Sequence, residues 1–225
     1  MPVKPVKIER DAARTRKNII AAATFEFSMK GFDGARIDEI AKRSQCNKNM
    51  IYHYYGSKDQ LFTAVLENAY EGLRKHQQDL SIIGLDPIEG MHKLVGYTFD
   101  AFVQMPDLIR LINSENLHRG EHIRKSSKVR EMYDPLFFTL KDLLQRGEAE
   151  GIFRKNLDPA NLYISIAALV YHYVSNHYTL ETLVGRELIT DERIEERRNH
   201  VINMILSYCA TNEAIAGIRS DLPHA

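Results

Sequence analysis

Residues 36–58 read RIDEIAKRSQCNKNMIYHYYGSK, a stretch with two short runs of helical periodicity separated by polar residues. Its apolar side chains fall into two sets at helical spacing, first Ile37, Ile40 and Ala41, then Cys46, Met50 and Ile51. Ser44 and Gln45 lie between the sets and indicate a tight turn. Two short helices joined in this way predict a helix-turn-helix, in which the second helix enters the major groove of DNA.

The second of these helices has side chains suited to DNA. Asn47 can cap it by accepting a hydrogen bond from an unpaired backbone amide. Lys48 and Asn49 are its first exposed positions, and these residue types can recognise guanine and adenine, respectively. Tyr52 and Tyr54 are two residues apart, about 200° around a helix, so they cannot both face inward. We therefore expect at least one of the two hydroxyls to reach a phosphate.

The end of the second helix also has a readable pattern. Tyr55 is better explained as core than as a DNA contact. Gly56 is expected to end the helix, and Ser57 to cap the next one. Lys58 then lies beside a new helix N-terminus, where backbone amides and an ammonium group can hold a phosphate together.

These residues resemble the DNA-binding domain of the TetR family of bacterial transcription regulators. The resemblance covers about the first quarter of the chain, and its motifs are Gly31-Phe32, Ile40-Ala41, the run from Ile51 to Lys58, and Leu61-Phe62. Asn47 and Asn49 depart from the residue types common in the family, which bears on the operator sequence. The resemblance implies base contacts by Lys48 and Asn49, and we add Arg36, for which a phosphate contact is the alternative. It implies phosphate contacts by Tyr52, Tyr54 and Lys58, to which we add His53.

The composition limits the number of domains and the kinds of partner that the chain can bind. The chain has 225 residues, 44% of them hydrophobic, so it can bury a sizeable core in one large or two small domains. Its formal charge of zero argues by itself against nucleic-acid binding. Residues 1–60, however, carry twelve Lys and Arg against seven Asp and Glu, a net charge of +5 that leaves −5 for the rest. A basic head on an acidic body fits a phosphate-binding module joined to a second function.

The cysteines and the apolar runs indicate the compartment. Cys46 and Cys209 are far apart in the sequence and suggest no disulfide framework. The sequence has no apolar run of membrane-spanning length and no signal peptide. We therefore expect a soluble, cytoplasmic protein with no membrane partner.

Helical periodicity continues along the chain, without sustained alternation. We expect helices over residues 12–30, 58–79, 88–104, 106–118, 123–150, 158–183 and 191–209, besides the two short ones. The predicted fold is all-α, with an N-terminal three-helix helix-turn-helix DNA-binding domain joined to a larger helical ligand-binding and dimerisation domain. The boundaries we assign are 1–11 for a flexible basic arm, 12–57 for the DNA-binding domain, 58–209 for the effector-binding and dimerisation domain, and 210–225 for a tail. The arm is either disordered or contacts DNA.

The body has two candidate surfaces. The helix predicted over 158–183 is too aromatic to bury all its rings against its own domain, so part of it lines an interface or a cavity. In the TetR family the last two helices form a dimer interface, which implies one made by Leu162, Ile166, Leu169, Tyr173, Val201 and Ile205. The helices before them enclose a small-molecule pocket, for which the candidates are Phe99, Phe102, Met105, Asn113, Asn116, Tyr133, Phe137, Tyr171, His172 and Asn176. Ordinary core packing is the alternative for the apolar members. Asn113 and Asn116 are stronger candidates, because a buried amide needs partners that a ligand can supply.

One constellation suggests an enzyme. Glu89-x-x-His92 and Glu115-x-x-His118 repeat a pair that di-iron helical bundles use twice. Glu89, however, follows Pro87 in a first helical turn, where acidic residues are common for dipole reasons. The sequence also lacks a phosphate loop, a Gly-x-Ser-x-Gly motif and a Cys pair, so we expect no catalytic residue, resident metal or cofactor.

We therefore predict a homodimeric transcriptional repressor. Its partners would be double-stranded DNA with a palindromic operator, a second copy of the chain, and a small-molecule effector that releases the DNA. A dimer is also expected physically, because two recognition helices about 34 Å apart read successive major grooves. An activator of transcription is the variant that the sequence leaves open, and a metal-dependent helical-bundle enzyme is the alternative from another class.

Overall fold

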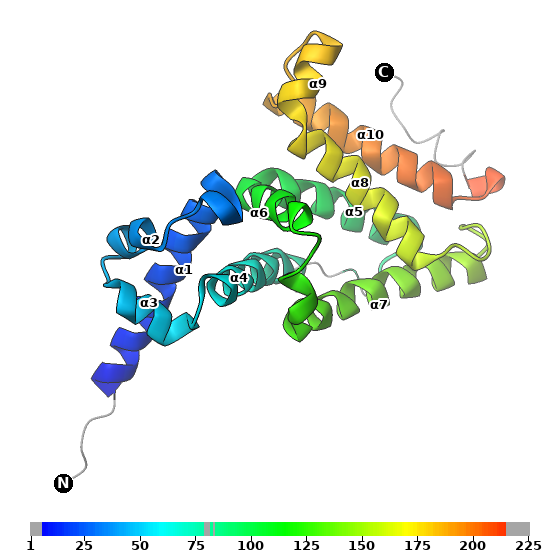
Figure 1. Cartoon of the computed structure of the whole chain (residues 1–225). Coiled ribbons are helices and arrows are strands. Elements are labelled where there is room, and N and C mark those ends of the chain that lie inside the picture. The colour runs from blue at the N-terminus through cyan, green and yellow to red at the C-terminus, as the bar shows by residue number, and fades with distance from the viewer. Residues whose placement is uncertain (1–5, 79–81, 83, 215–225) are drawn as a thin grey trace. The chain divides into compact units, whose positions relative to one another are not determined.

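The computed structural model describes residues 6–78, 82 and 84–214 and is helical almost throughout (Figure 1). Its helices are α1 (Val6–Gly34), α2 (Ile37–Ser44), α3 (Lys48–Tyr55), α4 (Lys58–Gln78), α5 (Pro87–Gln104), α6 (Pro106–Leu117), η1 (Ile123–Lys125, a 3-10 turn), α7 (Ser127–Ala149), α8 (Pro159–Ser175), α9 (His177–Val184) and α10 (Asp191–Cys209). Over the described ranges there is no strand beyond a single antiparallel bridge between Phe153 and Ala210. The all-α prediction is confirmed.

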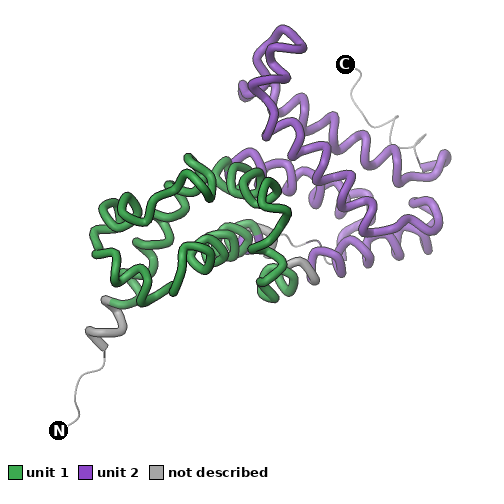
Figure 2. The backbone as a smooth tube through the Cα atoms, viewed as in Figure 1, with its two compact units in different colours: residues 1–73, 106–132 green, residues 74–105, 133–225 purple. Residues whose placement is uncertain are grey.

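The chain forms two compact units (Figure 2). Unit 1 comprises residues 1–73 and 106–132, and unit 2 comprises residues 74–105 and 133–225. Unit 1 therefore contains α1 to α3, most of α4, α6 and η1, whereas unit 2 contains α5 and α8 to α10. Within the described part of the chain, no helix is both long and apolar enough to cross a membrane.

The helix-turn-helix in unit 1 forms where the local signals place it. Gln45 adopts a left-handed conformation with φ 57° and makes the turn after α2. Asn47 caps α3, since its Oδ1 accepts from the amide of Met50 at 2.8 Å. Ser57 caps α4 by accepting from the amide of Gln60 at 3.1 Å. These caps satisfy amides that would otherwise lack partners.

An aromatic core holds the three N-terminal helices to α4. The ring centroids of Phe27 and Phe62 are 4.9 Å apart, and those of Phe32 and Phe62 are 5.2 Å apart. Ile40 of α2 and Ile51 of α3 are buried on the inner side of the helix-turn-helix. Burial of each such side chain contributes about 1.5–3 kcal/mol. The small head therefore gains stability by packing on the start of the next helix.

The first helix is longer than predicted at both ends. It begins at Val6 rather than near Ala12, so residues 6–11 of the expected arm are helical, while residues 1–5 lie outside the described residues. Gly31 was expected to end it, and Gly31 does interrupt the helix with φ 68° and ψ 176°. The chain then makes one further turn to Gly34, because the amide of Ala35 bonds to the carbonyl of Gly31 at 3.2 Å.

Unit 2 is built on the packing of α5 against α8 and α10. The buried apolar residues at this contact are Phe99, Leu162, Ile166, Val170, Val201, Ile202 and Ile205. Arg198 of α10 makes a two-pronged pair with Asp100 of α5, at 2.8 and 3.1 Å. A Cβ at Gly96 would lie 2.5 Å from the Arg198 guanidinium, so Gly96 makes room for that pair.

Two predicted helices in the C-terminal half have wrong bounds. The helix expected over 158–183 divides at Asn176, where the His177 ring lies 2.8 Å from the carbonyl of Val174 and competes with the helical hydrogen bonds. The helix expected from residue 123 begins at Ser127, since Ser126 Oγ accepts from the amide of Val129 at 3.3 Å. The start of the predicted tail, at Ala210 and Thr211, is hydrogen-bonded to the rest of the chain. The amides of Arg154 and Thr211 bond to the carbonyls of Cys209 and Ile152, which ties this part of the chain down.

Candidate DNA interface

The exposed face of α3 presents most of the residues predicted to contact DNA. Burial of Ile51 turns one side of the helix inward and leaves Lys48, Asn49, Tyr52 and His53 exposed. Short polar and aromatic side chains on an exposed, capped helix match the requirements for reading base edges and bonding phosphates. The structure thus brings these four predicted residues together on one surface.

Lys48 is paired with an acidic residue of the preceding helix. Its Nζ lies 3.1 Å from Oδ1 of Asp38, and both side chains are well exposed. The hydrogen bond with the Asp38 carboxylate raises the pKa of Lys48. Lys48 is therefore charged at neutral pH, and binding of a base or phosphate by its ammonium would compete with Asp38. Sequence reasoning missed this pair, which joins α2 to α3 across the turn.

The other two tyrosines of α3 face α1. Tyr54 is half-buried, and the Arg16 guanidinium lies 5.1 Å from its ring centroid. Tyr55 donates its hydroxyl hydrogen to the carbonyl of Arg16 at 3.3 Å, and burial raises the pKa of that hydroxyl. Arg16 is itself exposed, so it adds a cation to this surface that the sequence prediction did not assign.

Arg36 and Lys58 lie at the two helix starts that flank the helix-turn-helix. The Arg36 side chain is exposed, and its backbone amide donates to Oε1 of the buried Glu26 at 3.2 Å. The same oxygen lies 2.7 Å from Lys30 Nζ. Burial raises the pKa of Glu26, but the bonds from Lys30 and from the Arg36 amide outweigh it, so the net pKa is lowered. Glu26 thereby joins the end of α1 to the start of α2.

Lys58 is half-buried at the first position of α4. Its Nζ lies 4.9 Å from the ring centroid of Phe32 and donates to the carbonyl of Asp33 at 3.4 Å. The ammonium is thus held beside the α4 N-terminus, where the sequence placed a phosphate contact.

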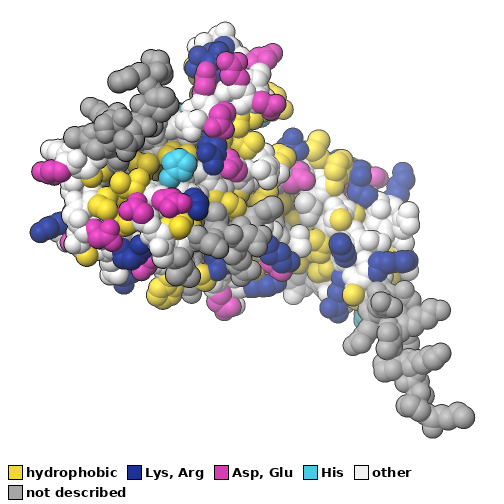
Figure 3. All heavy atoms as spheres, turned by 180° about the vertical axis from the view of Figure 1, so that it is seen from behind, with side chains coloured by type: hydrophobic (Ala, Val, Ile, Leu, Met, Phe, Trp, Pro, Cys, Tyr) yellow, Lys and Arg dark blue, Asp and Glu magenta, His cyan; other side chains and the backbone are white. Residues whose placement is uncertain are grey.

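The surface charge follows the asymmetry of the sequence. On the face shown in Figure 3, Lys and Arg predominate among the charged side chains of unit 1, and Asp and Glu are frequent over unit 2. Positive charge near the helix-turn-helix attracts phosphates in a manner that depends on salt.

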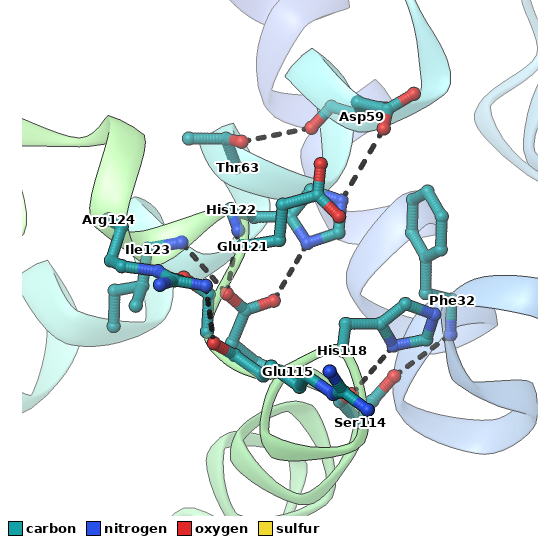
Figure 4. A network of polar contacts seen from close by, with 12 residues as sticks. Phe32, Asp59, Thr63, Ser114, Glu115, His118, Glu121, His122, Ile123 and Arg124 are labelled. Atoms are coloured by element: carbon teal, nitrogen blue, oxygen red, sulfur yellow. Dashed lines mark hydrogen bonds and ion pairs between the residues drawn. The ribbon is translucent and has the colours of Figure 1, made fainter.

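A buried polar network ties the turn after α6 to the rest of unit 1 (Figure 4). Glu115 Oε1 accepts from the amides of His122 and Ile123, both at 2.8 Å, and Oε2 lies 2.8 Å from His122 Nδ1. Ser114 Oγ accepts from the amide of Phe32 at 2.9 Å, next to the kink in α1. His122 Nε2 is buried without a hydrogen-bond partner, 3.6 Å from a carboxylate oxygen of Asp59 on α4.

In the structure, the residues of the two Glu-x-x-His pairs have other partners or are exposed. Glu115 is occupied by backbone amides and an imidazole, and His118 is held by the Ser114 carbonyl and by Asp33. Glu89, in the other unit, is exposed, with Lys93 3.2 Å away. Among the residues that the structure describes, no group of three His, Cys, Asp or Glu side chains is arranged to hold a metal ion. The Glu-x-x-His spacing therefore reflects helix-terminal packing in one case and a solvent-exposed turn in the other.

Comparison with known proteins agrees with this geometry. Residues 19–65 match the family model for bacterial regulatory proteins of the tetR family, and residues 87–205 match the tetracyclin repressor-like C-terminal domain. The chain belongs to the TetR family. It is 36% identical over 179 residues to the HTH-type transcriptional repressor NicS of Pseudomonas putida, covering 80% of this chain and 84% of that one. It is 35% identical over 180 residues to the HTH-type transcriptional repressor SCO4008 of Streptomyces coelicolor, covering 78% and 86%.

A solved structure shows the same fold over most of its length. The transcriptional regulator SCO4942 of Streptomyces coelicolor superposes with a TM-score of 0.65 at 25% identity, covering 87% of this chain and 98% of that one. This TetR-family protein is accordingly a helix-turn-helix transcription regulator, and nothing in the comparisons supports the metal-enzyme alternative.

The structure places the predicted effector-pocket residues in both units. Asn113 and Asn116 lie in unit 1, whereas Phe99, Phe102 and Phe137 lie in unit 2. Asn116 is exposed and bonds the carbonyl of Ile112, so it is not the buried amide that was expected. Phe99 and Phe102 are buried in the core, and Phe137 packs against Tyr163 with ring centroids 5.3 Å apart. The side chain of Tyr133 lies outside the described residues.

Of the remaining candidates, His172 lines a cavity of about 470 Å³ in unit 2. The Asn176 Nδ2 atom lies 3.2 Å from Nδ1 of His172, and Tyr171 and Met105 are half-buried. Tyr173 of α8, which was predicted for a dimer interface, also lines this cavity. The rest of the lining was not predicted and comes from α9, the following loop and α10, where the sequence offered arginines and aliphatic residues without a recognisable motif.

The residues predicted for a dimer interface are largely covered within a single chain. Leu162, Ile166, Tyr173, Val201 and Ile205 are buried, and Leu169 is half-buried. They lie on α8 and α10, the two helices that pack against α5. The exposed apolar residues of this region are Ile164, Tyr178, Leu183, Val184, Ile189, Met204 and Tyr208.

Proposed function

We propose that this TetR-family regulator is a homodimeric repressor that binds a palindromic operator and releases it when a small molecule binds to unit 2. The observation that carries the proposal is the exposed face of α3, where Lys48, Asn49, Tyr52 and His53 lie together on a capped recognition helix. One such helix contacts few base pairs, and a second copy doubles the sequence that is read. Repression rather than activation is favoured by the relatives NicS and SCO4008, both named repressors.

DNA binding and effector binding would be assigned to the two domains expected from the sequence. Residues 12–57 would contact DNA, with Lys48, Asn49 and Arg36 at base edges and Tyr52, His53, Tyr54 and Lys58 at phosphates. Residues 58–209 would bind the effector and the second subunit. Helix α4 belongs to unit 1 up to Leu73 and to unit 2 from Arg74, so it is one of the connections between the units through which an effector could alter the spacing of the heads. The protein would act in the cytoplasm, where the operator is.

The dimer is supported by apolar side chains that a lone chain leaves in water. Ile164 of α8 and Met204 and Tyr208 of α10 are exposed, on the two helices that the family uses for dimerisation. Exposed apolar clusters of this kind mark association surfaces. Light scattering of the purified protein should give the mass of two chains, and Met204→Lys should shift it toward one. A monomeric parent protein would overturn this part of the proposal.

The main test is selection of bound sites from random double-stranded DNA. Two inverted half-sites about one helical turn apart are the expected result, because a two-fold dimer presents two equivalent recognition helices. A single unrepeated half-site would contradict the palindrome, and no enrichment would contradict sequence-specific binding.

Base reading is tested by Lys48→Ala, with Lys42→Ala as the matched control. Both lysines are exposed, but Lys42 belongs to α2 and Lys48 to the first turn of α3. Lys48→Ala should alter the preferred base at one position of each half-site, whereas Lys42→Ala should leave the preference unchanged. Unaltered discrimination in Lys48→Ala would show that this lysine reads no base.

A further inference from the structure

The cavity of about 470 Å³ in unit 2 has the size and walls of a small-molecule site. Ligand sites typically occupy roughly 300–1,000 Å³ and are mostly apolar with a few placed polar groups. One side of this cavity is lined by Tyr173 of α8, by Leu180 and Val184 of α9, and by Leu188 of the following loop. These residues can cover the flat or aliphatic body of an organic molecule.

The polar side of the cavity has an excess of positive charge. Arg186, Arg193 and Arg197 line it, against a single carboxylate from Glu196. Arg193 and Glu196 neutralise each other, since Arg193 Nη1 lies 2.6 and 2.8 Å from the two carboxylate oxygens. Arg186 and Arg197 have no ion pair with any acidic residue in the described part of the chain. Within the described residues, two guanidinium groups of the cavity are therefore without an acidic partner and can pair with an anionic ligand.

Arg197 is the more constrained of these two arginines. Its Nη2 donates to the carbonyl of Leu169 at 3.1 Å, and its guanidinium lies 5.3 Å from the ring centroid of Tyr173. Its Nε is buried and has no hydrogen-bond partner. Burial also lowers the pKa of Arg197, which means that the charged form lacks the solvation it would have in water. A buried, unpaired donor of this kind is costly unless a ligand satisfies it.

We propose that this cavity binds a small organic carboxylate, whose charge pairs with Arg197 and Arg186 and whose body packs against Tyr173. A guanidinium group matches a carboxylate because two N–H donors can bond its two oxygens at once. The apolar wall favours an anion with an organic body over a bare inorganic ion. The site itself needs no DNA, but its regulatory meaning rests on the proposed function: the carboxylate would be the effector, or one of its class.

The test is calorimetric titration of the full-length protein with four probes: benzoate, the neutral benzamide, acetate and inorganic phosphate. Benzoate should bind at least about tenfold more tightly than benzamide, because the latter forms no ion pair. Benzoate should also bind more tightly than acetate and phosphate, because neither of these can cover the apolar wall. Equal affinity for benzoate and benzamide would contradict the proposal that the negative charge is recognised. Equal affinity for benzoate and phosphate would contradict the proposal that the organic body of the ligand is recognised. No heat with any probe would overturn the site.

Variants locate the binding in the cavity. Arg197→Gln should weaken benzoate binding at least about tenfold, and Arg186→Gln, at an exposed position, should also weaken it. Arg130→Gln, an exposed arginine of α7 in unit 1, is the matched control and should bind like the parent. Benzoate binding that is unchanged in Arg186→Gln and in a folded Arg197→Gln would place the ligand elsewhere and sink the proposal.

A parallel operator-binding assay separates this inference from the proposed function. Protein that binds its selected DNA but no benzoate would refute the carboxylate site and leave the regulator intact. Protein that binds benzoate through Arg197 but fails to bind DNA would uphold the site and refute the proposed function. If Arg197→Gln changes self-association and the parent binds no benzoate, the cavity is filled by a second chain and the proposal is wrong.

Discussion

The Glu115 carboxylate lies 2.8 Å from Nδ1 of His122, and both side chains are buried. The same carboxylate accepts two backbone amides, so it closes the turn that follows α6. The histidine ring that it holds packs against Phe32 and Phe62, with centroids 4.6 and 4.9 Å away. Through this one carboxylate the turn between α6 and α7 is fixed to the aromatic core beneath the DNA-binding helices.

Glu115→Ala should destabilise the protein severely. It would leave two buried amides and a buried imidazole without their acceptor, and each unsatisfied group costs about 1–3 kcal/mol. We expect the free energy of unfolding to fall by about 2–5 kcal/mol, measured by urea denaturation followed by circular dichroism. Glu121→Ala, an exposed carboxylate of the same turn that pairs with Lys125, should behave like the parent. Parity between the two variants would show that the Glu115 bonds are dispensable.

His118 should make stability depend on pH in a defined direction. The hydrogen bond with the Ser114 carbonyl raises its pKa, and Asp33 and Glu115 raise it further against the opposing effect of burial. A raised folded-state pKa stabilises the fold below the unfolded value of about 6.5, and the effect is lost as pH rises through the folded value. His118→Gln should therefore lower the melting temperature more at pH 5.5 than at pH 8.5. A larger loss at the alkaline pH would reverse the assigned sign.

Asp38→Asn should strengthen binding to the operator. The change releases Lys48 from its ion pair and removes a negative charge beside the recognition helix. We expect roughly a two- to five-fold gain in operator affinity at low salt, shrinking as salt rises. Glu39→Gln is the matched control, because it removes the same charge from exposed α2 without freeing Lys48. If both variants gain equally, general repulsion explains the effect and the ion pair has no part in it.

Thiol labelling should distinguish the two cysteines. Burial raises the pKa of Cys209 to about 12, so almost no thiolate exists near neutral pH. Cys46 is half-buried beside Ser44, with Sγ 2.9 Å from Oγ. Native protein treated with a thiol reagent at pH 8 should lose one thiol quickly, and Cys46→Ser should abolish that fast phase. Rapid labelling of both sites in the folded protein would contradict the burial of Cys209.

Local signals predicted the head well and the body less well. The caps at Asn47 and Ser57 and the stripe through Ile40 and Ile51 depend on neighbours within a few residues, so the sequence encodes them directly. The break at Asn176 depends on side chains that compete for helical carbonyls, and hydrophobic periodicity does not register that competition.

The candidate surfaces of unit 2 could not be assigned from the sequence for a different reason. Periodicity shows that Leu162 and Ile166 share a face, but it does not show whether α5 or a second chain covers that face. The cavity lined by Arg197 is formed by the packing of α8, α9, the loop after α9 and α10, which carry no recognisable motif. A cavity of this kind can be identified only when the arrangement of the helices around it is known.

A single carboxylate oxygen of Glu26 accepts hydrogen bonds from Lys30 and from the Arg36 amide, on either side of the kink at Gly31. We therefore expect α1 and α2 not to move relative to each other, so that the three helices of the head tilt as a rigid body. Such a head can be moved toward or away from the groove, but its reading surface keeps its shape. Regulation would then change how often the operator is occupied and leave untouched which operator is chosen.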